Sequence, residues 1–117
     1  MNPTDPQTSS ALAIHAQRRQ YPRFPAQVPV DLCQEGGNSV LRMETRDLSR
    51  GGCSIPLMAS LSVGSYVQIT LWLNETPVGI RGRAVTRHPE FGNGIMFLKF
   101  QDVSEGVLVS YLDAISQ

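Results

Sequence analysis

The chain has 117 residues, 41% of them hydrophobic, and its ten Lys and Arg residues balance ten Asp and Glu residues. This length fits one compact core and excludes two, and the balanced charge excludes a protein that coats nucleic acid or membrane through bulk charge. No apolar stretch reaches the ~18 to 20 residues that span a bilayer, and no N-terminal run is typical of a signal peptide. With two cysteines, the chain has no disulfide framework, and we expect a cytoplasmic protein without membrane insertion.

The N-terminal third of the chain begins with a tail and continues into a hairpin. Residues 1–17 are rich in Pro, Thr, Ser and Gln, which predicts a flexible N-terminal tail. From Phe24 to Cys33 hydrophobic and polar residues alternate, which predicts a strand, and Pro29 within it indicates a sheet edge or a bulge. Turn residues then lead to a second alternating segment, 40–46, so the two segments are expected to pair.

Four further strands are expected after this hairpin. The segment DLSRGG, residues 47–52, is predicted as a break before a short third strand, 53–57. The fourth strand, 66–73, alternates throughout, and its outward aromatic residues Tyr66 and Trp72 are expected to cover a terminal helix or to form a partner surface. The fifth strand is predicted at 78–87, and GIMFLKF forms the sixth.

The C-terminal segment has helical periodicity. Hydrophobic residues between Val107 and Ile115 recur at helical spacing, and Asp102 followed by Glu105 has the spacing of a capping box. These signals predict an amphipathic helix over about 103–115. Six short antiparallel strands and one terminal helix predict an all-β fold, a small six-stranded antiparallel β-barrel with a C-terminal α-helix.

An arginine-rich stretch precedes the first predicted strand. RRQYPR begins at Arg18 and contains an Arg-x-x-x-Arg pattern at Arg19 and Arg23. A planar guanidinium suits a carboxylate, a phosphate or a base edge that must be held in a defined geometry. Because Pro22 favours an extended backbone before it, the arginines are expected to spread along a ligand-binding arm, residues 18–24.

A second motif falls in the predicted break after the second strand. DLSRGG contains an Asp-x-Ser-x-x-Gly pattern at Asp47, Ser49 and Gly52. Asp and Ser side chains in a turn bond the local backbone, and glycines allow close approach of a ligand to the main chain. Taken alone, the segment is equally typical of a tight β-turn.

The two motifs together, in this strand order, resemble the PilZ domain family over residues 18 to about 115. The resemblance implies a PilZ-like barrel domain at 18–117 that acts as a bacterial, non-enzymatic receptor for cyclic di-GMP. It also implies that ligand binding changes the conformation of the domain, which signals to an unidentified effector protein in motility, adhesion or secretion. No cofactor other than the ligand is implied.

The resemblance also assigns ligand contacts. Guanine offers O6 and N7 as acceptors for an arginine, while its N1 and N2 hydrogens need a carboxylate. The implied ligand-binding residues are Arg18, Arg19, Arg23, Asp47, Ser49 and Gly52. The end of the fifth strand departs from the family pattern, because RAVTRHP stands where many relatives carry a flat side chain that stacks on the ligand. Arg87 is assigned this role here, with His88 as the alternative.

Two other functions remain open. One is a PilZ-like protein-interaction module that does not bind the nucleotide. The other is a small barrel that binds single-stranded nucleic acid by stacking bases on Tyr21, Phe24 and Trp72, although zero net charge and a single lysine argue against a nucleic-acid partner. The histidines and cysteines lack the spacing of zinc ligands, and nothing ties them to a nucleophile and base, so neither a metal site nor an enzyme is expected.

Overall fold

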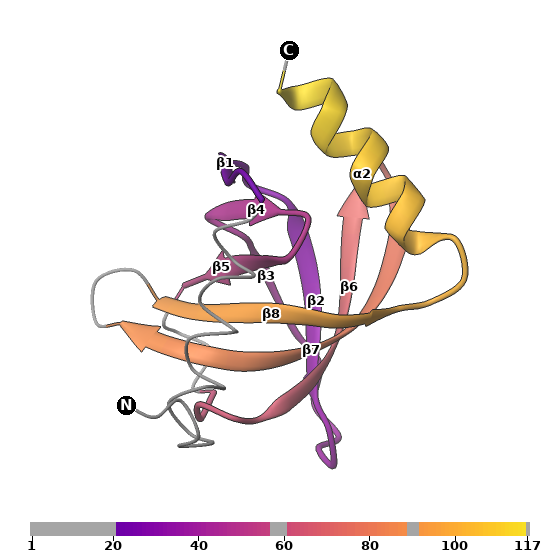
Figure 1. Cartoon of the computed structure of the whole chain (residues 1–117). Helices are drawn as coiled ribbons and strands as arrows, with labels where there is room; N and C mark the ends of the chain where they lie inside the picture. The colour runs from indigo at the N-terminus through magenta and orange to yellow at the C-terminus, as the bar shows by residue number, and fades with distance from the viewer. Residues whose placement is uncertain (1–20, 57–60, 89–91, 117) are drawn as a thin grey trace, which may run out of the picture.

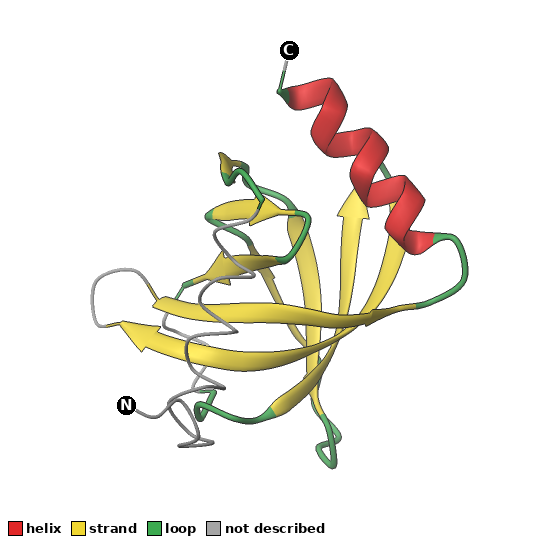
Figure 2. Cartoon of the chain, in the orientation of Figure 1, coloured by secondary structure: helices red, strands yellow, loops and turns green. Residues whose placement is uncertain are grey.

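The computed structural model describes residues 21–56, 61–88 and 92–116 of the chain. One curled antiparallel sheet is accompanied by a C-terminal helix, α2, at Ser104–Ile115 (Figures 1 and 2). Within the described residues, no helix is long and apolar enough to cross a membrane. The strands are β1 (Phe24–Pro25), β2 (Pro29–Gln34), β3 (Leu41–Glu44), β4 (Asp47–Ser49), β5 (Gly52–Ile55), β6 (Tyr66–Leu73), β7 (Thr76–His88) and β8 (Gly92–Phe100).

The all-β class with a terminal helix is confirmed, but the sheet has eight strands where six were predicted. The difference arises because the first predicted strand is divided into β1 and β2, and the second continues past an interruption from β3 into β4. β1 pairs with β4 and β2 pairs with β3, so these segments form one interrupted hairpin. Since β2 also pairs with β6 and β4 with β5, this hairpin joins both ends of the sheet and produces the barrel-like curl.

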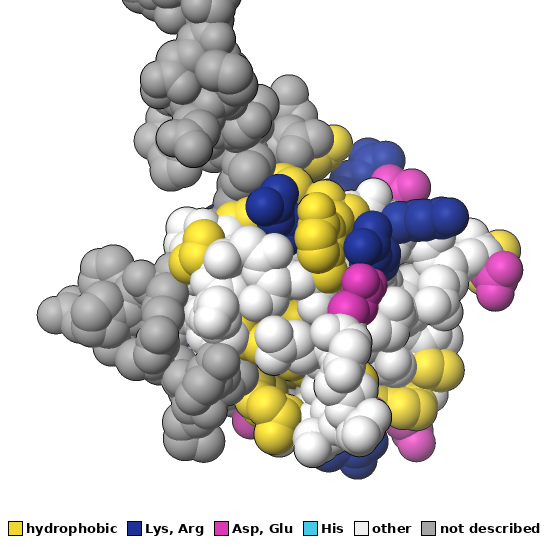
Figure 3. Space-filling model, turned by 90° about the horizontal axis from the view of Figure 1, so that it is seen from below, with side chains coloured by type: hydrophobic (Ala, Val, Ile, Leu, Met, Phe, Trp, Pro, Cys, Tyr) yellow, Lys and Arg dark blue, Asp and Glu magenta, His cyan; other side chains and the backbone are white. Residues whose placement is uncertain are grey.

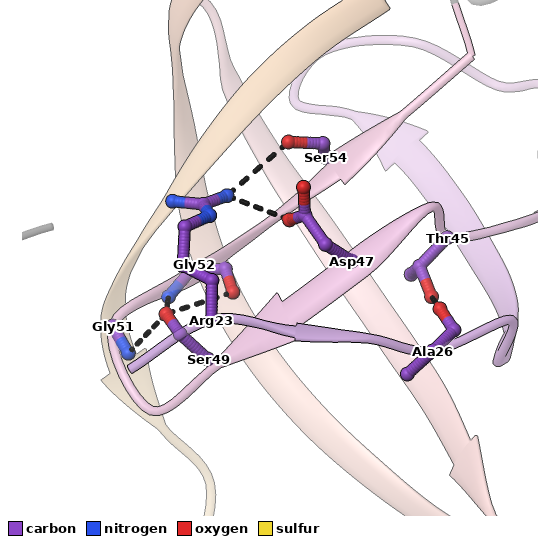
Figure 4. Close-up of polar contacts among 8 residues, drawn as sticks. All are labelled: Arg23, Ala26, Thr45, Asp47, Ser49, Gly51, Gly52 and Ser54. Carbon is purple, nitrogen blue, oxygen red and sulfur yellow. Dashed lines mark hydrogen bonds and ion pairs between the residues drawn. The ribbon is translucent and has the colours of Figure 1, made fainter. Parts of the chain in front are cut away.

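Thr45 satisfies the backbone at the interruption of the hairpin. Its side chain is buried, and its hydroxyl accepts from the Val28 N–H at 3.0 Å and donates to the Ala26 carbonyl at 2.6 Å (Figure 4). Buried backbone groups that leave a strand ladder need such partners. β2 then begins at Pro29, which has no N–H to donate; β2 pairs with β3 on one side and β6 on the other, so it is not the predicted edge strand.

The hydrophobic core lies inside the curl. In β6 every second side chain points into this core, as the sequence alternation predicts. These inward side chains are at most 2% exposed, at Val67, Ile69, Leu71 and Leu73. The helix α2 adds Leu108 and Leu112 to the same core cluster. The hydroxyl of Ser104 also accepts a 3.1 Å hydrogen bond from the Gly79 N–H on β7, which attaches the first turn of α2 to the sheet.

The position of α2 is close to the prediction, but the predicted capping box is wrong. The N-cap is Val103, and no side chain caps the helix. Asp102 has a φ of 48° and does not occupy the capping position, while the Glu105 carboxylate lies 3.4 Å from the guanidinium of Arg50. The start of the helix is therefore determined by contacts with the sheet and with the β4–β5 turn.

The outward aromatic residues of β6 contact neighbouring strands, whereas α2 packs on the core. The Trp72 indole N–H donates to Asp31 on β2 at 3.1 Å. The ring of Tyr66 lies beneath two guanidinium groups of β7, at 4.4 Å from Arg81 and 5.3 Å from Arg83. Figure 3 shows a face of the molecule where basic side chains lie beside hydrophobic and acidic ones. The contacts seen for these aromatics are with β2 and β7, and their cover of α2 stays a prediction.

Candidate functional site

Arg23 and Asp47, one from each motif, meet on the outer face of the sheet. Arg23 immediately precedes β1, whose pairing with β4 brings the arm alongside Asp47. The Arg23 Nη2 lies 2.7 Å from Asp47 Oδ1 and 3.2 Å from the Ser54 hydroxyl on β5 (Figure 4). The Arg23 and Asp47 side chains are 28% and 32% exposed, so the pair is partly shielded and still reachable from solvent.

This pair has hydrogen-bonding capacity beyond its mutual contact. Both contacts of Arg23 use the same nitrogen, Nη2, and the contact of Asp47 uses one carboxylate oxygen. A guanidinium carries five N–H donors and a carboxylate has two acceptor oxygens. A ligand that presents acceptors and donors side by side can therefore bind both residues without separating them.

Ser49 and Gly52 shape the turn between β4 and β5. The buried Ser49 hydroxyl accepts from the N–H groups of Gly51 and Gly52, each at 3.1 Å, and lies 3.3 Å from the Gly52 carbonyl. A Cβ on Gly52 would collide with the Ile95 carbonyl oxygen of β8. These contacts give both residues a role in placing Asp47, and direct contact of either residue with a ligand stays a prediction.

The other predicted ligand residues are only partly visible. Arg18 and Arg19 lie outside the described residues. Arg87 is opposite Asn93 near the end of β7, but the structure does not describe its side chain. A register shift between Ala84 and Thr86 changes which residues of β7 face outward, so counting alternate positions from the sequence does not identify a stacking residue there.

Sequence analysis missed a row of short residues that crosses the outer face beside Arg23. The strand register joins Asp47 to Ser54, Ser54 to Gly94 on β8, and Gly94 to Thr86 on β7. The adjacent row is fully buried, at Leu48, Cys53, Ile95 and Ala84, so the first row points away from the core. The alternation of residues in β5 indicates that Ser54 faces outward. The sequence does not show that β5 lies next to β4, which carries Asp47.

Arg50 extends the basic character of the site toward α2. It occupies the β4–β5 turn, and its guanidinium lies 5.6 Å from the centre of the Tyr21 ring. A groove of about 430 Å³ lies beside it, with Tyr21, Gly51, Lys99 and Glu105 among the lining residues. The groove between the β4–β5 turn and α2 therefore carries two cations, Arg50 and Lys99.

The three aromatic residues suggested for a nucleic-acid-binding barrel do not line one surface: Tyr21 and Phe24 line one hollow, and Trp72 lines another. Phe24 packs against the hydrophobic core, and Trp72 donates to Asp31 at the junction of β2 and β6. Tyr21 lies beside Arg50 at the opposite side of the hairpin interruption. In the described part of the chain, no group of three or more His, Cys, Asp and Glu side chains is placed to hold a metal ion.

The model of the PilZ domain family matches residues 17–114, a span that includes both motifs, the whole sheet and most of α2. The chain belongs to the PilZ domain family. This confirms the resemblance carried by the two motifs, and the Arg23–Asp47 contact shows how the PilZ domain brings them together. The PilZ domain has no match among the curated proteins.

Solved structures share the fold of this PilZ domain. The PilZ domain of CeSA from a cellulose-synthesizing bacterium aligns with a TM-score of 0.61 and 23% identity, over 82% of this chain and 99% of that one. The Bacillus subtilis inhibitor of motility (MotI/DgrA) aligns at 0.64 and 20%, over 85% of this chain and 51% of its own length. The PilZ domain of Escherichia coli YcgR, solved with c-di-GMP, aligns at 0.57 and 20%, over 85% and 92%.

Proposed function

We propose that this PilZ domain is a cytoplasmic receptor for cyclic di-GMP that acts as a non-enzymatic adapter. The observation that carries the proposal is the surface pair of Arg23 and Asp47, which joins the arginine arm to the second motif. The similar fold of the YcgR PilZ domain, whose structure was solved with c-di-GMP, supports the same ligand class. In this proposal Arg18, Arg19 and Arg87 contribute further contacts from the arm and from the end of β7.

The chemistry of the pair fits a guanine nucleotide. The guanidinium of Arg23 donates to O6 and N7 of guanine or to a phosphate, and the carboxylate of Asp47 accepts from N1 and N2. A ligand with two guanines and two phosphates presents all of these groups within one molecule. Ser49 and Gly52 keep the backbone of the turn in the position from which Asp47 reaches the ligand.

Signalling follows from the position of Arg23 on the arm. The arm enters the sheet through β1, which pairs with β4 at only two positions, Phe24 with Leu48 and Pro25 with Asp47. Arg23 already connects the arm to Asp47 and Ser54, and a ligand held by Arg23 and Asp47 adds further contacts at this point. The arm and the ligand then present a changed surface to an effector protein in motility, adhesion or secretion.

The first prediction is that Arg23→Ala weakens cyclic di-GMP binding by about tenfold or more, because a hydrogen bond to a charged group contributes about 1.5 to 3 kcal/mol. Isothermal titration of the full chain measures the affinity, with GTP as a competitor of simpler structure. Arg42→Ala is the matched control, since Arg42 also forms an ion pair on the sheet, with Asp31 at 2.6 Å. Circular dichroism checks that both variants remain folded.

The alternatives make different predictions in the same titration. If wild-type protein shows neither heat nor a shift in melting temperature with cyclic di-GMP, the proposal is wrong and Arg23 is a structural contact of a protein-interaction module. The satisfied contact of Arg23 with Asp47 and Ser54 is the observation that favours this second function. Binding of unrelated RNA oligonucleotides with equal affinity would indicate a nucleic-acid-binding barrel.

A further inference from the structure

Arg50 lies where three segments that are distant in the sequence come together: the arm, the β4–β5 turn and α2. It belongs to the β4–β5 turn, its guanidinium is 5.6 Å from the ring of Tyr21 on the arm, and its Nη2 is 3.4 Å from Glu105 Oε2 in the first turn of α2. It also lines the groove of about 430 Å³ together with Lys99. Arg50, in the motif turn, therefore contacts both the arm and α2.

Among the ion pairs between described residues, the pair of Arg50 with Glu105 has the longest distance between nitrogen and oxygen. Arg42 and Arg81 each donate two hydrogen bonds to a carboxylate, with the shorter at 2.6 and 2.7 Å. Arg23 lies 2.7 Å from Asp47. The Arg50–Glu105 pair makes one contact of 3.4 Å, and its side chains are 48% and 51% exposed. Exposed pairs of this kind contribute little to stability and exchange partners readily.

The spacing along the arm places Arg50 within reach of a ligand bound at Arg23. Tyr21 and Arg23 are two residues apart, a separation of about 7 Å in an extended chain. Tyr21 lies beside Arg50 while Arg23 contacts Asp47, so two arm residues that are two positions apart contact Arg50 and Asp47. A ligand with two phosphates extends over this distance.

We propose that Arg50 is a further phosphate-binding residue of this site and that Glu105 is its internal competitor, a proposal that rests on the proposed binding of cyclic di-GMP. In the unliganded domain the Glu105 carboxylate occupies the guanidinium of Arg50. A ligand phosphate takes its place, and Arg50 moves from α2 to the ligand. Glu105 keeps a favourable position after this exchange, because an acidic residue in the first turn of a helix is stabilised by the helix dipole.

The exchange also gives α2 a role in regulation. The pair with Glu105 connects the motif turn to the first turn of the helix, where Ser104 accepts from the Gly79 N–H. When Arg50 binds the ligand, this connection is lost and the outer surface near Glu105 becomes a free carboxylate. An effector that contacts this part of α2 therefore meets a different charge pattern in the liganded state.

The test is a double-mutant cycle measured by isothermal titration of the full chain with cyclic di-GMP. Glu105→Gln is expected to bind about two- to fivefold tighter than wild type, because the competing carboxylate is removed. Arg50→Gln is expected to bind about tenfold weaker or more. In the Arg50→Gln background, Glu105→Gln should have no further effect, since the guanidinium for which it competes is absent. Glu35→Gln is the control for charge, because Glu35 pairs with Arg81 instead.

The outcomes separate this inference from the proposed function. If wild type binds and Glu105→Gln does not bind more tightly than Glu35→Gln, the competition is absent and the inference is wrong. A gain from Glu105→Gln that persists in the Arg50→Gln background would also overturn it, because the carboxylate would then act by general repulsion. If the wild-type chain does not bind cyclic di-GMP, both the proposed function and the inference fail.

Discussion

Ser49 and Gly52 carry no charge, but they determine where the charged residues of the motif lie. The hydroxyl of Ser49 binds the N–H groups of the turn, and Gly52 allows the backbone of β5 to approach the Ile95 carbonyl of β8. Asp47 begins β4 before this turn, and Arg50 lies within the turn. At the residue scale, the motif therefore combines two residues that build the backbone with charged residues whose positions depend on it.

We expect Gly52→Ala to lower the free energy of unfolding by about 2 kcal/mol or more, because the added methyl group meets backbone atoms that side-chain rotation cannot move. Urea denaturation at neutral pH measures the change. Gly106→Ala in α2 is the matched control, since a Cβ at Gly106 meets nothing within 4 Å. That substitution should raise the free energy of unfolding by about 0.5 to 1 kcal/mol through helix propensity. Equal stability of Gly52→Ala and wild type would show that β5 and β8 are not in close contact at this position.

At the scale of elements, Asp31 connects three strands on the side of the sheet away from the motif. Its carboxylate on β2 accepts two hydrogen bonds from Arg42 on β3, at 2.6 and 2.8 Å, and one from the Trp72 indole on β6 at 3.1 Å. The contacts with Arg42, and then the one with Trp72, lower the pKa of Asp31 from 3.8 to about 2. Protonation of Asp31 therefore weakens the association of these strands.

The sign of the pH dependence follows from this lowered pKa. The contribution of Asp31 to stability is fully present above its unfolded pKa of 3.8 and is lost as the pH falls toward the folded value of about 2. Asp31→Asn should be less stable than wild type at pH 7, and the difference should shrink across this window in urea denaturation. Trp72→Phe removes the N–H donor together with part of the ring, and the pH-dependent part of its effect should be smaller over the same range. A difference between Asp31→Asn and wild type that is constant from pH 7 to pH 2 would contradict the assignment.

The elements themselves differ in how far the sequence predicts them. β6 is predicted correctly because one face is buried along its whole length, which produces strict alternation. DLSRGG was interpreted as a break because its Ser and Gly residues are turn formers, yet it contains β4 and the start of β5 around a tight turn. The capping box was wrong because the N-cap is Val103, Asp102 before it has a φ of 48°, and the Glu105 carboxylate pairs with Arg50, which local spacing cannot reveal.

The candidate site was predictable to the extent that motifs carry it. The two motifs and their family resemblance assigned Arg23 and Asp47 to one ligand site, but their direct contact was not predicted. Ser54 was missed because its approach to Arg23 depends on the pairing of β4 with β5. The register shift near Thr86 was equally inaccessible, because a bulge depends on how two long strands twist against each other.

For the whole molecule, the balance of charge limits how a ligand is captured. The chain has ten basic and ten acidic residues. In the described part of the chain, the guanidinium groups of Arg23, Arg42 and Arg81 each lie within 2.7 Å of a carboxylate oxygen. Long-range attraction of an anion is weak under these conditions, and screening at physiological salt confines electrostatic forces to about 8 Å. Recognition of a nucleotide must therefore depend on the few groups that line the Arg23–Asp47 site and the groove beside Arg50.

Binding of cyclic di-GMP is expected to depend only weakly on salt concentration. A ligand with two phosphates releases at most about two counterions, so the logarithm of affinity should fall with the logarithm of salt concentration with a slope no steeper than about −2. A single-stranded nucleic acid contacting six phosphates would give a slope of about −4. Titrations between about 50 and 200 mM salt, within the range where screening changes, distinguish the two. A steep slope, with RNA oligonucleotides bound as tightly as cyclic di-GMP, would mean that a continuous basic surface and not a local site controls binding.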